Sequence, residues 1–505
     1  MNNEPILLVG FDALDMDIVR KAVSSGRMPT FKHLLESWRQ APTEAPPGVY
    51  VGAIWPSFST CLNPGRHGRY CYEQLIPGTY ESRRVYSHEI MEAPSFWHAL
   101  SDAGKRTAII DVPLQGTPRP INGLQVFQWG AHDPERPFYT HPPEWRENIL
   151  SREGAYPVEA RANATRTRPE EFAGLRDRLL KGIKLKTDLT ARVMKEERWD
   201  LCVSIFSETH TAGHLLWHLH DTSHPLHSPE LSEQVGDAML DVYSACDRAL
   251  GELIDKAKNS CRIMAFASHG MEAFYHLTFM LDPILNALET ANRHTWQRRG
   301  LTAAAAVIRH GGSWVRRTGQ PWLEEKIGNL ARRYADIKPR AERAYFAIPN
   351  NKVWGGIRLN LVGREPGGLI GPSHKQRIEE QLIKDLFDLK DPVTGNPVVR
   401  NVVRSRDVFH GEFMNRLPDL LVEWSNERYT TSVWSPKAGM IHGAWNLPRT
   451  GNHTSRGVIF SQPLTGQFKT PCKPSSVMDI GPTICRALGV ELQNVDGHII
   501  EGLLC

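Results

Sequence analysis

The sequence has no feature of an exported or membrane-bound protein. Its 505 residues include eight cysteines, but these form no CxxC pair and no tight cluster, as a disulfide framework or a zinc knot would require. The amino terminus has no basic segment followed by an apolar one, and no apolar run reaches the ~18 residues of a membrane span. We therefore expect a cytoplasmic protein with reduced, buried cysteines and no membrane partner.

An excess of charge of either sign is also missing. The formal net charge is +4, which over this length is too small to indicate nucleic-acid binding. Hydrophobic residues make up 41% and charged residues 23%, as in ordinary globular proteins. No internal repeat or low-complexity segment stands out. The expected partner is a small-molecule substrate, and nothing in the sequence indicates an oligomeric state.

Short apolar runs alternate with helical patterns along most of the chain. Each run has four to seven apolar residues between polar or turn residues, which is typical of strands buried on both faces. Strands and helices in alternation predict an α/β fold, with a mostly parallel central sheet and helices on both faces. The four clearest strands are expected within residues 5–13, 106–113, 200–208 and 261–268.

The segment 283–340 differs from the rest because it is rich in arginine and has good helical periodicity. We interpret it as a helical insertion or cap over the sheet edge. The alternative is that these arginines form a nucleic-acid-binding surface, but arginine-rich helix faces usually have no function beyond exposure to solvent. The expected division is therefore a discontinuous α/β core, 1–282 and 341–505, with the insertion between its two parts.

Five polar residues stand where apolar runs give way to turns or helix starts. Such positions collect at the edge of a parallel sheet where open α/β folds bind ligands. Carboxylate and imidazole groups from separate strand ends can converge there on a cation. The five are Asp12, His210, His214, His269 and His453.

The chain resembles the alkaline phosphatase superfamily, in particular its nucleotide pyrophosphatase/phosphodiesterase branch. Nine segments carry the likeness in the same order, among them VGFDALDMDIVRKAVSSGRMPTFKHLLESW, WPSFSTCLNPGRHG, FSETHTAGHLLWHLHD, ASHGM and GNHTSRGVIFSQP. The resemblance implies an alkaline phosphatase-like fold and two zinc ions a few ångström apart, which clamp the attacking and leaving oxygens of phosphoryl transfer. It also implies a Thr or Ser nucleophile that forms a covalent intermediate.

The nucleophile side of this implied site is incomplete. Asp12 and His269 match two ligands of the nucleophile-side metal. The nucleophile position, four residues before Trp55, holds Val51, and the aspartate of the family's SDHGM motif is replaced by Ser268. Valine can neither attack phosphorus nor bind a cation, so this side keeps two of its four usual ligands.

The other side of the implied site, which would hold the second metal, keeps more of its ligands. His214 and His453 match family ligands, and His210 stands where the family most often has aspartate. Spacing i, i+4 puts His210 and His214 on one helix face. Three imidazoles with an open fourth position resemble a catalytic zinc site. We expect one tightly bound divalent metal, with zinc favoured, and a second site that is weak or absent.

Other residues are given smaller roles. Asp12 and His269 are candidate acid or base groups or weak second-metal ligands, and His442 and Ser268 are candidate substrate contacts. Several more residues are weighed and set aside: Ser57, Ser59 and Thr43 as substitute nucleophiles, His67 as a turn residue, and His218, His220, His224 and His227 on a helix leaving the site.

Three hypotheses stay open at this point. The favoured one is an atypical metal-dependent enzyme, a phosphodiesterase-like hydrolase, in which a metal-bound water or Lewis acid cleaves or transfers a phosphate or other ester without a covalent nucleophile. Lyase, transferase or isomerase chemistry is not excluded by this hypothesis. The second is a non-catalytic binding or scaffold relative with an eroded dinuclear site. The third is an ordinary phosphodiesterase or phosphatase with a displaced nucleophile.

Overall fold

The computed structural model describes residues 4–116, 119–132, 134–158, 166–258, 260–293, 339–443, 449–463 and 472–504. The expected insertion at 283–340 begins inside helix α12 (Leu281–Arg293), and its residues 294–338 lie outside the described residues. Among the described residues, no helix is both long enough and apolar enough to cross a membrane. The cysteines described are free thiols, and most of them are buried.

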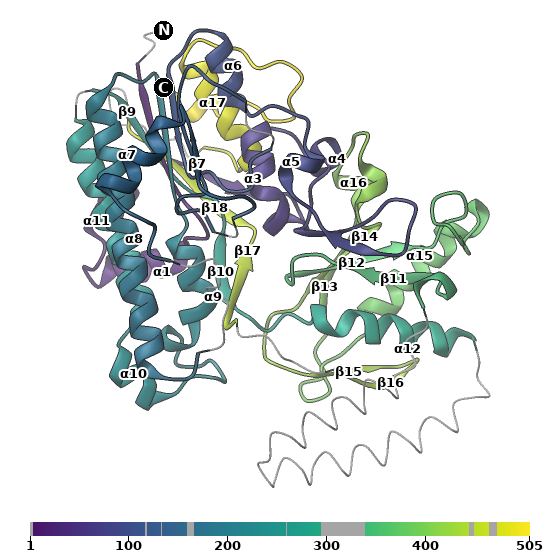
Figure 1. The fold of residues 1–505 in the computed structure, drawn as a ribbon. Helices are drawn as coiled ribbons and strands as arrows, with labels where there is room; N and C mark the ends of the chain where they lie inside the picture. Colours follow the sequence, from purple (N-terminus) through teal and green to yellow (C-terminus); the bar gives the residue numbers. More distant parts are fainter. Residues whose placement is uncertain are drawn as a thin grey trace.

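The main body is built on a nine-stranded sheet with an α/β arrangement (Figure 1). Its five central strands, β9-β1-β8-β5-β6, pair in parallel, and all four strands expected from the sequence are among them. The predicted fold class is therefore confirmed. In sheet order the strands are β19 (Ser475–Ser476), β2 (Arg39–Glu44), β18 (Arg456–Ser461), β9 (Arg262–Ala267), β1 (Ile6–Phe11), β8 (Leu201–Phe206), β5 (Thr107–Ile110), β6 (Gly123–Phe127) and β7 (Tyr139–His141).

Helices cover both faces of this sheet. Strand β1 is apolar at every position because both of its faces are buried. Leu7, Val9 and Phe11 belong to the apolar cluster on one face of the sheet, and Ile6 and Leu8 belong to the cluster on the other. The first face carries α1 (Met16–Ser24), α2 (Pro29–Ser37), α8 (Pro169–Glu196), α9 (Glu208–His220) and α11 (Ala238–Ala257), with α7 (Glu144–Arg152) and α10 (Pro229–Val235) nearby. The second carries α3 (Tyr50–Thr60), α6 (Phe96–Asp102) and α17 (Ile480–Ala487).

A second, antiparallel sheet lies beside the main body (Figure 1). Its strands share an apolar cluster that includes Leu285 of α12 and Leu382. An apolar run alone does not say which sheet a strand joins. In sheet order the strands are β11 (Tyr345–Ile348), β12 (Trp354–Leu359), β14 (Leu420–Trp424) and β13 (Val399–Arg404), accompanied by α15 (Pro372–Phe387) and the hairpin β15 (Ser432–Ser435) and β16 (Gly439–His442).

The topology brings distant segments to one edge of the main sheet. The parallel strands β1, β8 and β9 all end there, while β18 is antiparallel to β9, so the residues before β18 reach the same edge. This edge is where open α/β folds bind ligands. The remaining short elements are α4 (Pro64–His67), α5 (Ser87–Ile90), α16 (Ser405–Val408), β3 (Glu73–Leu75), β4 (Ser82–Arg84) and the antiparallel pair β10 (Gly270–Ala273) and β17 (Gly451–Thr454).

Candidate metal centre

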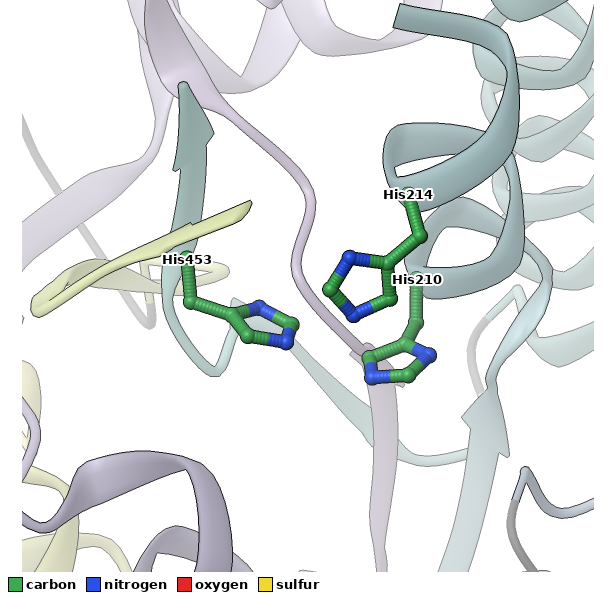
Figure 2. Close-up of side chains that lie close together, drawn as sticks. All are labelled: His210, His214 and His453. Carbon is green, nitrogen blue, oxygen red and sulfur yellow. The ribbon is translucent and has the colours of Figure 1, made fainter. Parts of the chain in front are cut away.

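Three imidazoles meet at this edge, as the sequence predicted. His210 and His214 lie one turn apart on α9, and His453 lies on β17. The ring centroids are 4.6 Å apart for His210 and His214, 4.5 Å for His214 and His453, and 5.0 Å for His210 and His453. Figure 2 shows one nitrogen of each ring turned toward a common centre, and one ligand nitrogen from each lies within 4.8 Å of the others. The spacing suits a single metal ion.

The tautomer of His453 is set by a chain of hydrogen bonds that begins at Asp12. A carboxylate can only accept, so the Ser268 hydroxyl donates to Asp12 Oδ1 at 3.2 Å. Ser268 Oγ then accepts from His269 Nδ1 at 2.8 Å. With its proton on Nδ1, His269 accepts through Nε2 from His453 Nδ1, also at 2.8 Å. His453 Nε2 is therefore left with its lone pair.

That lone pair is the clearest sign of a ligand. His453 is completely buried, and its Nε2 has no hydrogen-bond partner among the described residues. A buried nitrogen without a partner costs free energy. Burial and the neighbouring imidazoles hold the pKa of His453 well below its ordinary value, so the ring is neutral, as a metal ligand must be.

His214 is oriented in a similar way. Its Nδ1 lies 2.8 Å from the carbonyl oxygen of Gly451 and donates to it, which leaves Nε2 as the acceptor. Arg449 Nη1 donates to this Nε2 at 3.1 Å. Burial lowers the pKa of His214 well below its ordinary value, and the Arg449 charge lowers it further. A metal on His214 would take the place of this guanidinium.

The nucleophile side is closed by contacts within the protein. Val51 lies half-buried on α3 and packs on the apolar cluster of the second face. Both ring nitrogens of His269 are engaged, by Ser268 and by His453. Burial lowers the pKa of His269 to about 4, although Asp12 opposes this shift. Ser268 therefore serves as a hydrogen-bond link where the family has a metal ligand.

Asp12 has one oxygen held by the protein and one that faces another imidazole. It does not cap α1, because Asp15 does. Oδ1 accepts from Trp55 Nε1 at 3.1 Å as well as from Ser268, whereas Oδ2 lies 2.7 Å from Nδ1 of His132. Burial alone would raise the pKa of Asp12, but the charges of His132 and His210 bring it below its ordinary value.

Sequence reasoning missed His132. It lies in the loop after β6, and its ring stacks on His210 with centroids 4.0 Å apart. Ligand atoms of Asp12, His132 and His210 form a second group within 4.8 Å. The segment of the resemblance that contains β6 ends at Gly130, two residues before His132. The available signal was a histidine five residues after a buried strand that ends at the same sheet edge.

A cavity of about 90 Å³ adjoins the imidazoles. Its walls include Arg449, which the sequence analysis also missed, and the aromatic rings of Trp129 and Tyr156. Ser207 and Glu208, at the start of α9, line it as well. The cavity therefore combines apolar walls with a cationic group next to the candidate ligands.

The other residues considered from the sequence lie elsewhere or have structural partners. His442 lies exposed on β16, a strand that contacts α12 and carries none of the imidazoles. Ser57 is 2.9 Å from His67 Nε2, and Ser59 donates to the carbonyl oxygen of Pro56. Thr43 is buried on β2. The ring of His442 lies 2.9 Å from Ser432 Oγ on the neighbouring strand of its hairpin.

The histidines that follow His214 also have structural contacts. The ring of His218 lies 3.1 Å from Thr450 Oγ1, and that of His220 lies 2.7 Å from Asp237. His224 Nδ1 accepts from a backbone N–H, and His227 Nδ1 donates to a backbone carbonyl. His218 and His220 lie on α9 as expected, whereas His224 and His227 lie in the loop after it, because the helix ends at His220.

Comparison with known proteins identifies the family and the fold. The family model for type I phosphodiesterase / nucleotide pyrophosphatase matches residues 6–445. No curated protein matches the chain. Phosphonoacetate hydrolase from Sinorhizobium meliloti 1021 with phosphonoformate is similar in structure, with a TM-score of 0.53, 14% identity and coverage of 97% of this chain and 96% of that chain. Its complex with phosphonoacetate gives a TM-score of 0.53 and 13% identity over 97% and 96% of the two chains. At such identity the likeness shows the fold alone.

Proposed function

Because the chain belongs to the type I phosphodiesterase/nucleotide pyrophosphatase family, we propose that it is a metal-dependent hydrolase that cleaves a phosphate or other ester of a small molecule. One observation carries the proposal: three buried imidazoles from α9 and β17 converge, and His453 Nε2 has no hydrogen-bond partner among the described residues. A protein that used these rings only for packing would gain nothing from a nitrogen left in this state.

His210, His214 and His453 would hold the metal. Zinc fits this donor set, because neutral imidazoles in a tetrahedral arrangement with one open position are typical of catalytic zinc. The ion would polarise a phosphoryl oxygen and lower the pKa of a water in its open position. The Gly451 carbonyl and the hydrogen-bond chain through His269 would fix the ring orientations, as outer partners of metal ligands do.

Arg449 and the cavity would orient the substrate. Once a metal takes His214 Nε2, the guanidinium is released next to the cavity that it lines. A guanidinium can donate two parallel hydrogen bonds to phosphate oxygens. Trp129 and Tyr156 would contact the organic group of the ester. An anionic ester with an apolar or aromatic group therefore fits best.

The absence of a hydroxyl at position 51 favours direct attack by water. Val51 has no nucleophilic atom, and Ser57 and Ser59 are engaged away from the imidazoles. A single in-line displacement inverts the configuration at phosphorus, whereas two displacements through a covalent intermediate retain it. Hydrolysis of a chiral thiophosphate ester in ¹⁸O-labelled water distinguishes the two routes. We expect inversion, and retention would restore a displaced nucleophile.

One observation favours a second candidate, a non-catalytic binding module. The Arg449 guanidinium already supplies a positive charge at His214 Nε2. If that charge replaces the metal permanently, the site would bind an anion without turning it over. Metal content separates the two candidates, because only the enzyme needs an ion on the imidazoles.

The direct test combines metal content with an assay panel. Zinc-loaded protein would be assayed with bis(4-nitrophenyl) phosphate, 4-nitrophenyl phosphate and 4-nitrophenyl phenylphosphonate. His453→Ala should lose both metal and hydrolysis, while His98→Ala, a buried histidine on α6 outside the site, should keep both. A folded wild-type protein that binds no zinc and cleaves none of the three esters would contradict the proposal.

A further inference from the structure

We propose that Asp12 and His132 hold a second divalent cation beside the three-imidazole site. This inference rests on the proposed function, because it concerns the same metal centre. Its new element is His132, a donor that the family motifs do not contain, beside Asp12, which does match a motif ligand. The motif positions Val51 and Ser268 supply no good ligand, and His132 lies outside every segment that carries the resemblance.

The geometry of the donors carries the proposal. Asp12 Oδ2 and His132 Nδ1 are 2.7 Å apart, and a nitrogen of His210 completes a group within 4.8 Å. Asp12 is completely buried, and the side chain of His132 is only 10% exposed. A carboxylate with imidazoles is a donor set that zinc and similar ions accept. Two ions so close together could contact one phosphoryl group.

The motif residues on the other side of Asp12 are less suited to this role. Oδ1 of Asp12 already accepts from Trp55 and Ser268, so the oxygen that faces His132 is the one left for a metal. His269 would have to break its contact with Ser268 or with His453 to bind an ion. The second site is therefore displaced from the Val51 side toward β6.

The backbone just before His132 is held by buried charged groups. Asp111 is completely buried and accepts from the backbone N–H groups of Trp129 at 2.9 Å and Gly130 at 2.7 Å. Lys186, also completely buried, donates to the Gly130 carbonyl at 3.1 Å and lies 3.3 Å from Asp111 Oδ2. A loop fixed by a buried ion pair can hold a ligand at a defined position, as a metal site requires.

His210 explains why the two sites adjoin. Its ring lies between those of His132 and His453, at 4.0 Å and 5.0 Å, and it is nearly parallel to both. It belongs to both groups, but a neutral imidazole has a single lone pair, so His210 would coordinate one of the two ions. The family's aspartate at this position would stack on neither ring. The histidine at 210 and the histidine at 132 therefore act together in this proposal.

The experiment counts metal ions in the full-length protein. Wild type, His132→Ala, His453→Ala and the control His98→Ala would be stripped, reloaded with zinc, desalted and measured by plasma mass spectrometry. We expect two zinc ions per chain in wild type and in the control, and one in His132→Ala. Circular dichroism would verify folding of each variant. If His132→Ala does not fold, His132→Gln and Asp111→Asn serve in its place, because each weakens the same site.

The outcomes separate this inference from the proposed function. Two ions in wild type and one in His132→Ala support the second site. Two ions in both proteins, or one in both, overturn it. One ion in wild type and in His132→Ala that is lost in His453→Ala overturns the second site but leaves the proposed function standing. No zinc in any folded protein overturns both.

Discussion

The two sides of the site use their polar atoms in opposite ways. On the α9 side, His453 Nε2 has no hydrogen-bond partner in the described part of the chain, and His214 Nε2 accepts from Arg449 Nη1. On the α3 side, the rings and hydroxyls are engaged by one another, as in the contact of Ser268 with His269. An unpaired imidazole nitrogen that faces two further imidazoles is the arrangement that a metal ion would complete.

The two sides are nevertheless connected by hydrogen bonds. With valine at position 51 and serine at position 268, the α3 side cannot attack phosphorus and binds a metal poorly. The same Ser268 and His269 nevertheless fix the tautomer of His453 and turn its lone pair toward His210 and His214. The α3 side thus sets the orientation of the His453 ring.

The largest effect is expected from His453→Ala. It removes a nitrogen that faces His210 and His214 and has no hydrogen-bond partner among the described residues, so zinc should be lost from the three-imidazole site. A metal supplies several kcal/mol of stabilisation to a phosphoryl-transfer transition state, and its loss should lower kcat/KM by ~10³-fold. Steady-state kinetics and metal analysis measure this. Equal activity in His453→Ala and wild type would contradict the view that the α9 side, unlike the α3 side, holds a catalytic metal.

Lys186→Met should destabilise the fold by ~3–5 kcal/mol, because it leaves the buried Asp111 without its cationic partner. The loop with His132 should loosen as well. Denaturant unfolding measures the free energy. The matched control is Lys184→Met, which removes an exposed lysine that pairs with Asp188 on the same helix and should cost at most ~1 kcal/mol. Similar values for the two variants would contradict this role of Lys186.

Arg449→Met tests whether the guanidinium binds substrate or replaces the metal. Loss of charged hydrogen bonds to phosphate, each worth ~1.5–3 kcal/mol, should raise KM by ~10–100-fold. Zinc affinity should stay equal or increase, because a competitor for His214 Nε2 is gone. Kinetics and zinc titration against a chelating dye report the two effects. A loss of zinc in this variant would show that Arg449 supports the metal.

Ser268→Ala interrupts the hydrogen-bond chain that orients His453. Mutation of a residue that hydrogen-bonds to a metal ligand typically lowers metal affinity by ~10–100-fold. We expect Ser268→Ala to lower zinc affinity by this factor and Ser268→Thr, which keeps the hydroxyl, to recover most of it. The zinc titration used for Arg449→Met measures it. Unchanged affinity in Ser268→Ala would mean that the α3 side has no part in orienting the ligands.

Val51→Thr should have the smallest effect. It returns a hydroxyl to the family's nucleophile position, but Ser268 still replaces the aspartate that would bind a metal next to it. We expect kcat to change by less than ~10-fold, which corresponds to ~1.4 kcal/mol, and no covalent phosphoenzyme to form. Acid quenching with a ³²P-labelled ester tests for the intermediate. A trapped phosphoenzyme would show that the α3 side is still catalytically competent.

The central strands and the histidine pair on α9 could be predicted because each is indicated by residues close together in the sequence. The strand run 261–268 and the i, i+4 pair at 210 and 214 identify an element from its own residues. His132 and Arg449 could not be found in this way, since their roles depend on which loops the sheet order brings together. The expected substrate contact at His442 was assigned from its proximity in sequence to His453, yet a separate hairpin carries it.

Anomalous diffraction from crystals grown with zinc, recorded on both sides of the zinc absorption edge, tests the central claim most directly. The account predicts a strong peak at about 2.0–2.1 Å from the Nε2 atoms of His214 and His453 and from a ring nitrogen of His210, with Arg449 moved off His214. A zinc-saturated crystal in which Arg449 still donates to His214 and no peak lies between the three rings would contradict it.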